Sequence, residues 1–392
     1  MNILFIGGSL LSDDFRLRLK KKGITYSNAA ETFVSALLNG LCGLSKVRVV
    51  TEFFVPAYPK YDEYNIKGER FGHVSRAEVT SIPYLNIPVF QRLSKTWSFY
   101  REIKKQLKEK CDVVIIYEVT SRTLVSTLLA NKNKKVILIV PDLPEFMSNN
   151  QSALYKAAKK IDQIIIDYCL KKINGFVLFS PYMSNKIDIG NRPSITIEGI
   201  FNPMDIVASE RKNDKRVILY TGKIEKWFGL EDLFEAFLRV KEDCELWLCG
   251  TGDEGMINEY TSKDHRIKYL GSKTHQEVIK LQKQAYLLVN PRHSTEQFSM
   301  YSFPSKTMEY MASGTATLMC KLKSLPEDYY SHLFLFEDES IEGMAKTIDS
   351  ILQMDPVILE QKGAKAAEFI VNNKNSKTQA TKLLDFINTE VL

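Results

Sequence analysis

Short apolar runs of strand length recur along the chain, and stretches with helical periodicity separate many of them. In the first half the apolar runs lie at residues 3–6, 47–53, 112–118, 135–142, 175–180 and 195–200. Helical patterns lie at 91–110, 121–131 and 151–173. Continuous apolar runs are typical of strands buried on both faces, and alternation with helices favours a parallel sheet covered by helices. The pattern therefore predicts a doubly wound α/β fold.

The same alternation starts again at residue 216, which predicts a second domain. The chain has 392 residues, more than a single ordinary core accommodates. The second set of apolar runs lies at 216–222, 245–250, 267–271, 286–290, 316–320 and 333–337, with helical patterns at 230–238, 340–353, 357–373 and 376–389. We predict one Rossmann-like domain over 1–200 and another over 216–375. Residues 201–215, which hold a proline and a charged run, are the expected linker.

The segment 285–317 carries the most specific chemistry. Phe303-Pro304-Ser305-Lys306 begins a predicted helix, because proline suits a first helical turn, and Gly314 ends it. We expect free N–H groups at 305–307, and with the charge of Lys306 they would suit a phosphate. Glu309, one turn later, can accept hydrogen bonds from a ribose. An ordinary capped amphipathic helix is the alternative.

The run from Glu309 to Gly314, E-Y-M-A-S-G, resembles the E-x-M-A-S-G signature of retaining GT-B glycosyltransferases of family four, also called group one. The wider form Y-S-F-P-S-K-x-x-E-Y-M-A-S-G is similar to a branch found in bacterial surface-polysaccharide synthesis. The family has two glutamates eight positions apart; the second is Glu309 here, and the first falls on Tyr301. The resemblance implies two Rossmann-like domains facing a central cleft, with a last helix, 376–392, that crosses back to the first domain.

Residues 220–223, Y-T-G-K, resemble the family's strand–glycine–basic element. Gly222 would let the backbone approach a diphosphate, and Lys223 would neutralise charge on the leaving group. The family's second lysine falls on Phe228, and Lys226 is a possible stand-in. A solvated turn lysine is the alternative for Lys223.

Two further donor-side elements follow the family order. Gly250-Thr251-Gly252-Asp253 is similar to G-x-G-[DE], which places Gly250 near the nucleotide, although a turn without function has the same pattern. Arg292, in Asn290-Pro291-Arg292, is expected near the phosphates or the acceptor. Its alternative role is to tie down the loop 293–302.

On the acceptor side, Gly7 and Gly8 end the first strand, as in nucleotide-binding α/β domains. Asn28 is expected to cap the next helix. We expect residues 9–27 to form a lid or partly disordered loop, and residues 54–90 to be irregular and to shape an acceptor cleft.

Asp142 ends a predicted strand where the family's usual histidine is absent and Pro141 stands instead. It is expected to orient an acceptor hydroxyl or, alternatively, to cap the following turn. The catalytic candidates are Asp142, Tyr301 and Lys223, with Glu296 as a second substitute for the missing glutamate.

We expect no metal and no cofactor. The six cysteines form no C-x-x-C pair and are predicted to be buried free thiols. The five histidines do not have the spacing of metal ligands. No D-x-D motif is apparent, and Lys223 and Lys306 can supply the positive charge that a diphosphate needs.

Charge is distributed unevenly. Residues 1–199 hold 29 Lys and Arg against 18 Asp and Glu, a net +11, whereas residues 200–392 have a net −5. Basic clusters lie at Arg16–Lys22 and Arg101–Lys110. Each is either a solvated helix face or a contact with an anionic partner, such as a membrane surface or a diphosphate. Nucleic acid is disfavoured because aromatic residues do not alternate with these clusters.

The sequence as a whole predicts a cytoplasmic glycosyltransferase, of hexosyltransferase type, that can associate with the inner face of the membrane. No apolar run approaches the roughly 18 residues of a spanning helix, and no signal peptide precedes the first strand. By resemblance, the enzyme moves a sugar from a nucleotide-diphosphate donor to a lipid-linked saccharide, with retention, in capsule, exopolysaccharide or O-antigen synthesis. A non-catalytic donor-binding subunit and a GT-B epimerase or hydrolase are the alternatives.

Overall fold

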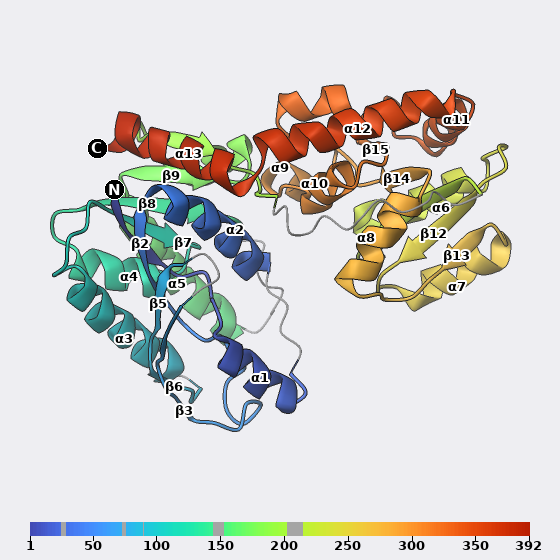
Figure 1. Cartoon of the computed structure of the whole chain (residues 1–392). Coiled ribbons are helices and arrows are strands. Elements are labelled where there is room, and N and C mark those ends of the chain that lie inside the picture. The colour runs from blue at the N-terminus through green and yellow to red at the C-terminus, as the bar shows by residue number, and fades with distance from the viewer. Residues whose placement is uncertain (25–28, 73–75, 89, 144–152, 202–214) are drawn as a thin grey trace. The chain divides into compact units, whose positions relative to one another are not determined.

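The computed structural model describes residues 1–24, 29–72, 76–88, 90–143, 153–201 and 215–392 (Figure 1). The chain divides into two compact units. The N-terminal unit comprises Met1–Ile200 and Ser376–Leu392, and the C-terminal unit comprises Phe201–Asn375. Asn28 and nearly all of the expected linker, residues 202–214, lie outside the described residues.

The N-terminal unit is built on an eight-stranded sheet with the order β10-β9-β8-β7-β1-β2-β5-β4. Its strands are β1 (Asn2–Ile6), β2 (Lys46–Thr51), β4 (Arg70–Gly72), β5 (Glu78–Ser81), β7 (Val113–Tyr117), β8 (Lys135–Val140), β9 (Gly175–Leu178) and β10 (Ser194–Thr196). All neighbours pair in parallel except β4 and β5, which are antiparallel. β3 (Asn65–Ile66) and β6 (Tyr84–Leu85) form a separate antiparallel pair. The predicted parallel sheet is confirmed.

The helices of this unit are α1 (Asp13–Lys21), α2 (Ala29–Leu44), α3 (Phe90–Gln106), α4 (Ser121–Ala130), α5 (Ala153–Leu170) and α13 (Ser376–Phe386), with a 3-10 turn at Pro181–Asn185 and a π turn at Ile387–Val391. α2 and α13 lie side by side (Figure 1) and share a core with Ile3 and Phe5 of β1. They approach closely at Gly40, where an added Cβ would lie 1.9 Å from the Ser376 carbonyl oxygen. Helices α3, α4 and α5 form a contiguous row, in which α4 contacts both of the others.

Two segments that the sequence predicts to be irregular contain regular structure. Residues 13–21, within the expected lid, form α1, which begins where the Ser12 hydroxyl accepts a hydrogen bond from the Phe15 N–H at 3.2 Å. Phe15 and Leu19 are buried against Phe53, so α1 is part of a small core and the lid prediction is wrong for this helix. Residues 54–90 hold β3 to β6, of which β5 extends the main sheet beside β2. These strands have two to four residues, too few to show a period.

The C-terminal unit has a six-stranded parallel sheet with the order β13-β12-β11-β14-β15-β16. Its strands are β11 (Val217–Thr221), β12 (Glu245–Cys249), β13 (Ile267–Tyr269), β14 (Leu287–Asn290), β15 (Thr317–Cys320) and β16 (Phe334–Phe336). Its helices are α6 (Leu230–Phe237), α7 (Glu254–Lys263), α8 (His275–Gln284), α9 (Gln297–Tyr301), α10 (Ser305–Ala312), α11 (Ile341–Leu352) and α12 (Pro356–Asn373). One apolar core joins strands and helices, including Leu233, Phe234 and Phe237 of α6, as their helical spacing indicates.

Candidate active site

Helix α10 is fixed beside the end of β11 by one buried tyrosine in its second turn. The Tyr310 hydroxyl accepts a hydrogen bond from the Thr221 N–H at 2.7 Å and lies 3.1 Å from the Thr221 carbonyl oxygen, to which it donates. Tyr310 is fully buried, so both of these backbone groups are satisfied without water. The carboxyl edge of a parallel sheet is where open α/β folds bind ligands, and Tyr310 brings α10 to that edge. The sequence motif contained this tyrosine but gave it no role.

Lys306 extends from the first turn of α10 across Gly222. A Cβ built on Gly222 would lie 1.4 Å from the Lys306 Nζ, and the φ of Gly222 is 139°, so only glycine leaves room for this side chain. The Nζ lies 5.2 Å from the centre of the Tyr220 ring and 6.0 Å from that of Phe228. The ring of Phe228, where the family has a second lysine, thus lies near an ammonium that comes from another helix.

Burial lowers the pKa of Lys306 to about 8; the Glu309 carboxylate opposes this effect and the Arg292 charge adds to it. Within the described part of the chain, the Lys306 Nζ has aromatic neighbours but no ion pair and no hydrogen bond. This half-buried ammonium therefore feels the Glu309 charge only at a distance, with no carboxylate in direct contact among the described residues. An anionic ligand would supply such a contact.

The backbone of the same turn differs from the prediction. The Ser305 N–H donates to the Phe303 carbonyl at 3.0 Å, and the Thr307 N–H donates to the Pro304 carbonyl at 2.8 Å. Two of the three N–H groups expected to be free are therefore already bonded, because the chain makes tight turns on entering the helix. The positive charge at this point comes chiefly from the Lys306 side chain.

Glu309 is held by a residue that sequence reasoning missed. Gln282, fully buried on α8, donates through Nε2 to the Glu309 carboxylate and lies 3.3 Å from the Thr221 hydroxyl. One feature of the sequence could have identified Gln282. It lies three residues after Ile279 and so shares the buried face of the amphipathic helix α8, where a polar residue is unusual. Glu309 itself is half-buried, with its carboxylate oriented by the Gln282 amide.

The glycines after β11 and β12 permit two loops to touch. An added Cβ on Gly250, whose φ is 149°, would lie 1.8 Å from the Gly222 carbonyl oxygen. On Gly252 it would lie 1.9 Å from the carbonyl oxygen of Ile224, its bridge partner. The G-x-G element therefore has a packing role at the carboxyl edge, beside Gly222 and Lys306.

Lys223 and Lys226 are arranged differently from Lys306. Both side chains are mostly exposed, and each has a carboxylate partner: Glu225 lies 3.3 Å from Lys223, and Glu231 lies 2.7 Å from Lys226. Lys223 also lies 5.4 Å from the Trp227 ring centre. Lys223 thus follows Gly222 directly, but its ammonium is exposed to solvent and lies near the Glu225 carboxylate.

Arg292, at the end of β14, is buried, and its Nε donates to the Ser299 hydroxyl at 2.8 Å. This contact ties the following loop to the sheet, in agreement with the alternative role given above. Burial lowers the pKa of Arg292 to about 10, and the charge of Glu296 opposes that effect. Glu296 is exposed at the start of α9, whereas Tyr301 is buried at its end.

His293 forms a cluster that no sequence spacing could show, because its members come from separate loops. Its Nε2 lies 2.8 Å from the Asp232 carboxylate, its Nδ1 lies 3.2 Å from that of Glu339, and the Ser294 N–H donates to Glu339 at 3.0 Å. The Cys320 Sγ lies within 4.8 Å of the ligand atoms of His293 and Glu339. These groups are already bonded to one another and join α6 to the loops after β14 and β16.

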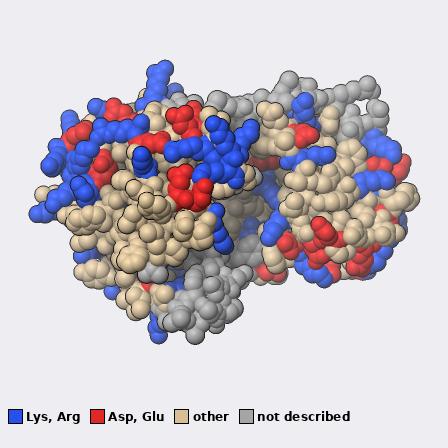
Figure 2. Space-filling view, turned by 90° about the horizontal axis from the view of Figure 1, so that it is seen from below, with Lys and Arg blue, Asp and Glu red and all other residues tan. Residues whose placement is uncertain are grey.

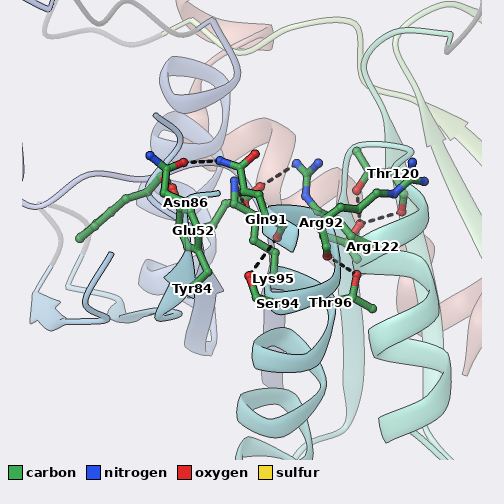
Figure 3. A network of polar contacts seen from close by, with 12 residues as sticks. Glu52, Tyr84, Asn86, Gln91, Arg92, Ser94, Lys95, Thr96, Thr120 and Arg122 are labelled. Carbon is green, nitrogen blue, oxygen red and sulfur yellow. Dashed lines mark hydrogen bonds and ion pairs between the residues drawn. The ribbon is translucent and has the colours of Figure 1, made fainter. Parts of the chain in front are cut away.

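A different network lies at the carboxyl edge of the N-terminal sheet (Figure 3). Glu52 follows β2 and is 3% exposed; Lys95 of α3 lies 3.0 Å from its carboxylate, and Arg122 of α4 lies 2.6 Å from it. The Lys95 ammonium also lies 4.2 Å from the Tyr84 ring centre. Arg92, one turn before Lys95, contacts Ser121 and Asp162. The cations of this network have carboxylate partners.

Asp142 and Glu118 lie beyond the ends of β8 and β7. Burial raises the pKa of Asp142, and burial, with smaller contributions from Glu52 and Asp142, raises that of Glu118 against the effect of Arg122. Glu118 has a φ of 79°, a backbone conformation that is unusual for a residue with a side chain. The two carboxyl groups are within electrostatic reach of each other.

Close packing leaves no room for a side chain at Gly7 or Gly8. Both have positive φ; an added Cβ would lie 2.7 Å from the Tyr117 carbonyl oxygen at Gly7 and 2.8 Å from a Val34 methyl group at Gly8. They let β1 end against β7 and α2. The structure shows no other role for them.

Comparisons with known proteins agree with this architecture. Residues 215–354 match the family model described as Glycosyl transferases group 1. No curated protein matches the chain. Similar solved structures include sucrose-phosphate synthase from Thermosynechococcus elongatus (14% identity, 99% of this chain and 98% of that chain, TM-score 0.63). Another is Anabaena HepE in complex with UDP (15% identity, 99% of this chain and 100% of that chain, TM-score 0.64). A third is the lipopolysaccharide outer core galactosyltransferase WaaB (14% identity, 99% of each chain, TM-score 0.63). The chain thus has the GT-B fold, with two Rossmann-like α/β domains, and its residues 215–354 are similar to group 1 glycosyl transferases.

Proposed function

We propose that this protein is a retaining glycosyltransferase that moves a hexosyl group from a nucleotide-diphosphate sugar to a lipid-linked saccharide. The observation that carries the proposal is Lys306, a half-buried ammonium at the carboxyl edge of the C-terminal sheet that has no ion pair within the described residues. A diphosphate supplies the anion for such a pair. HepE, which has the same fold, was solved with UDP, and this supports the same class of donor here.

In the proposed complex the diphosphate lies over Gly222 and contacts Lys306, and the Glu309 carboxylate accepts hydrogen bonds from the ribose. Gln282 holds that carboxylate in place. The bond between the anomeric carbon and the diphosphate oxygen breaks, and the Lys306 charge stabilises the negative charge that develops on the leaving group. Because that ammonium is already present, the proposed transfer needs no metal ion.

The new bond forms between the anomeric carbon and an acceptor hydroxyl, on the face that the diphosphate leaves. The configuration is therefore retained, and the hydroxyl proton passes to an oxygen of the departing diphosphate. Asp142, whose pKa burial raises, is the proposed group that orients the acceptor hydroxyl. Gly7, Gly8 and Asn28 belong to the proposed acceptor side through their place after β1 and before α2.

We assign the sugar contact of the missing first glutamate to Glu296. Its carboxylate is exposed and acts electrostatically on Arg292, whereas the Tyr301 side chain is buried. The Y-S-F-P-S-K form of the sequence supports a place in bacterial capsule, exopolysaccharide or O-antigen synthesis.

Turnover of nucleotide sugars with and without acceptor saccharides tests the proposal. We expect nucleoside diphosphate release that depends on the acceptor, a strong loss in Glu296→Gln, and a change below about threefold in Tyr301→Phe, because one buried hydroxyl away from the sugar contributes little. A loss confined to Tyr301→Phe would move the sugar contact to the phenol.

The absence of a glutamate at Tyr301 favours one rival, a non-catalytic subunit that only binds the donor. That reading predicts nucleotide binding without turnover for every acceptor tested. Turnover of the nucleotide sugar without any acceptor would instead indicate an epimerase or hydrolase.

A further inference from the structure

Helix α3 presents apolar side chains to solvent along one side. Leu93 is 67% exposed and Trp97 is 61% exposed, and they lie four residues apart and therefore on the same side of the helix. The opposite side of α3 is buried through Phe99 and Ile103. Because the inward side already has its core contacts, Leu93 and Trp97 are an additional apolar surface.

The neighbouring helices continue this surface. Leu129 of α4 and Ile161, Ile164 and Tyr168 of α5 are each more than three-fifths exposed. Residues 161, 164 and 168 share one side of α5. We define the apolar face as Leu93, Trp97, Leu129, Ile161, Ile164 and Tyr168.

Polar contacts also join the three helices. Arg92, next to Leu93, is paired with Asp162, next to Ile161. The Ser126 hydroxyl, one turn before Leu129, donates to the Thr96 carbonyl at 2.8 Å. The exposed apolar residues are therefore carried on one connected row of helices, and a soluble monomer rarely exposes a surface of this kind without a partner.

Basic residues adjoin the apolar face on the same helices. Arg101, Lys104, Lys105 and Lys108 are exposed on or just after α3, and Lys160, Lys171 and Lys172 are exposed on or just after α5. Figure 2 shows Lys and Arg side chains gathered on the N-terminal unit, at the left of the view. A second copy of the chain would bring like charges together. A surface with an apolar interior and anionic headgroups complements both the apolar and the basic residues.

The two basic clusters of the sequence differ in this respect. On α1, Arg16 is paired with Glu31, Arg18 with Glu69 and Lys22 with Asp62. On α3, Lys105 lies 3.6 Å from Glu102, but Arg101 and Lys108 have no ion pair within the described residues, and the Lys104 ammonium donates to the Tyr100 hydroxyl at 3.0 Å. The α3 cluster thus retains more unpaired charge, and it lies beside the apolar face.

We propose that the apolar face of α3, α4 and α5 docks on an anionic lipid bilayer. Leu93, Ile161 and Ile164 enter the boundary between headgroups and acyl chains, and Trp97 and Tyr168 lie at the headgroup level, which suits their amphipathic rings. The basic residues contact the lipid phosphates. No described helix is long and apolar enough to cross a membrane, so the contact is one of surface docking. The proposal stands apart from sugar transfer, because it uses none of the residues assigned to the donor site.

Sedimentation with phosphatidylcholine vesicles, with and without phosphatidylglycerol, tests the proposal on the full chain. We expect binding only to the vesicles with phosphatidylglycerol, weakening as salt rises. The double variant Leu93→Ser/Trp97→Ser should bind at least about tenfold more weakly, since each large apolar side chain that is buried contributes about tenfold. Lys104→Ser/Lys105→Ser should bind about thirtyfold more weakly, since each basic residue near the surface contributes about 1 kcal/mol.

The matched controls are Val357→Ser/Ile358→Ser, which changes two half-exposed apolar residues of α12, and Lys20→Ser/Lys21→Ser on α1. Both should bind vesicles like the parent chain. UDP affinity should be unchanged in all four variants, which separates this proposal from the donor site. Equal binding to both vesicle types, no binding, or an equal loss in the controls would overturn it. A dimer in light scattering that Leu93→Ser/Trp97→Ser dissociates would assign the face to a second copy instead.

Discussion

The carboxyl edges of the two sheets have similar positions in their folds and opposite electrostatics. At the N-terminal edge, Lys95 and Arg122 share the buried Glu52 carboxylate. At the C-terminal edge, the Lys306 ammonium lies near two aromatic rings and has no ion pair within the described residues, and the nearby Glu309 carboxylate receives its hydrogen bond from an amide. The cations of the first edge are in ion pairs, whereas the ammonium of the second has none within the described residues.

This difference matches the two substrates of a sugar transfer. A donor carries two phosphates, and an acceptor presents neutral hydroxyl groups. An edge with an unpaired cation suits the donor, and an edge whose cations are paired, with the uncharged forms of Asp142 and Glu118 favoured by burial, suits hydroxyl groups. Four experiments test this comparison.

The largest effect is expected from breaking the pairing at the N-terminal edge. Glu52→Gln should lower the free energy of unfolding by about 3–5 kcal/mol, because it leaves the charge of Lys95 buried without a carboxylate. Urea unfolding measures the change. Glu231→Gln, which removes an exposed partner of Lys226, is the control and should cost less than about 1 kcal/mol. Equal effects would show that the Glu52 network is not specially buried.

Lys306→Ala should weaken UDP binding by about 2–3 kcal/mol, the usual contribution of a charged hydrogen bond, and leave uridine binding nearly unchanged. Calorimetric titration measures both ligands. Because the Lys306 charge is half-buried without a partner, the variant should be at least as stable as the parent, the opposite of Glu52→Gln. Lys226→Ala is the control and should bind UDP normally. A variant that loses stability but not affinity would make Lys306 a structural residue.

The pH dependence gives the next largest effect. The pKa of Lys306 is lowered to about 8 and only the ammonium form attracts phosphate, so UDP affinity should fall as pH rises through 8, by about 1.4 kcal/mol per unit. For folding, the unfolded chain binds more protons between pH 8 and the ordinary lysine pKa of 10.5, so this group makes stability rise over that window. Lys306→Arg, which stays charged, should flatten the binding profile between pH 7 and 9. A profile that keeps its slope in this variant would assign the titration elsewhere.

The smallest effect is expected at Lys223. Its charge is mostly exposed and already faces Glu225, so Lys223→Ala should weaken UDP binding by less than about 1 kcal/mol. The same titration as for Lys306→Ala gives the value. A loss as large as that of Lys306→Ala would mean that Lys223 leaves Glu225 and encloses the diphosphate when the donor binds.

The sequence predicts the sheets well because their strands are continuous apolar runs, and β1, β7 and β8 appear close to the expected positions. It does not predict α1, because most residues of this helix are charged and only Phe15 and Leu19 are buried. The short strands β3 to β6 are missed because pairing over two to four residues depends on distant segments.

The candidate site shows the same limit. The motif identifies Lys306 and Glu309, but it ranks Lys223 with Lys306, since exposure and ion pairing are properties of the folded chain. Gln282 and Tyr310 orient the site through contacts with Thr221. Thr221 is 61 positions from Gln282 and 89 positions from Tyr310. No spacing in the sequence reveals contacts of that range.

The packing of α13 on α2 has a consequence for how the chain is synthesised. The core of the N-terminal unit includes Leu37 and Leu41 of α2 and also Leu383 and Ile387, which are translated more than 300 residues later. The C-terminal unit, Phe201–Asn375, is complete earlier. On the ribosome, the N-terminal unit therefore completes its core only after the C-terminal unit has been translated, and its α2 surface remains exposed until α13 emerges. A fragment that stops at residue 200 should expose this surface permanently, so the N-terminal unit should be produced with residues 376–392 attached.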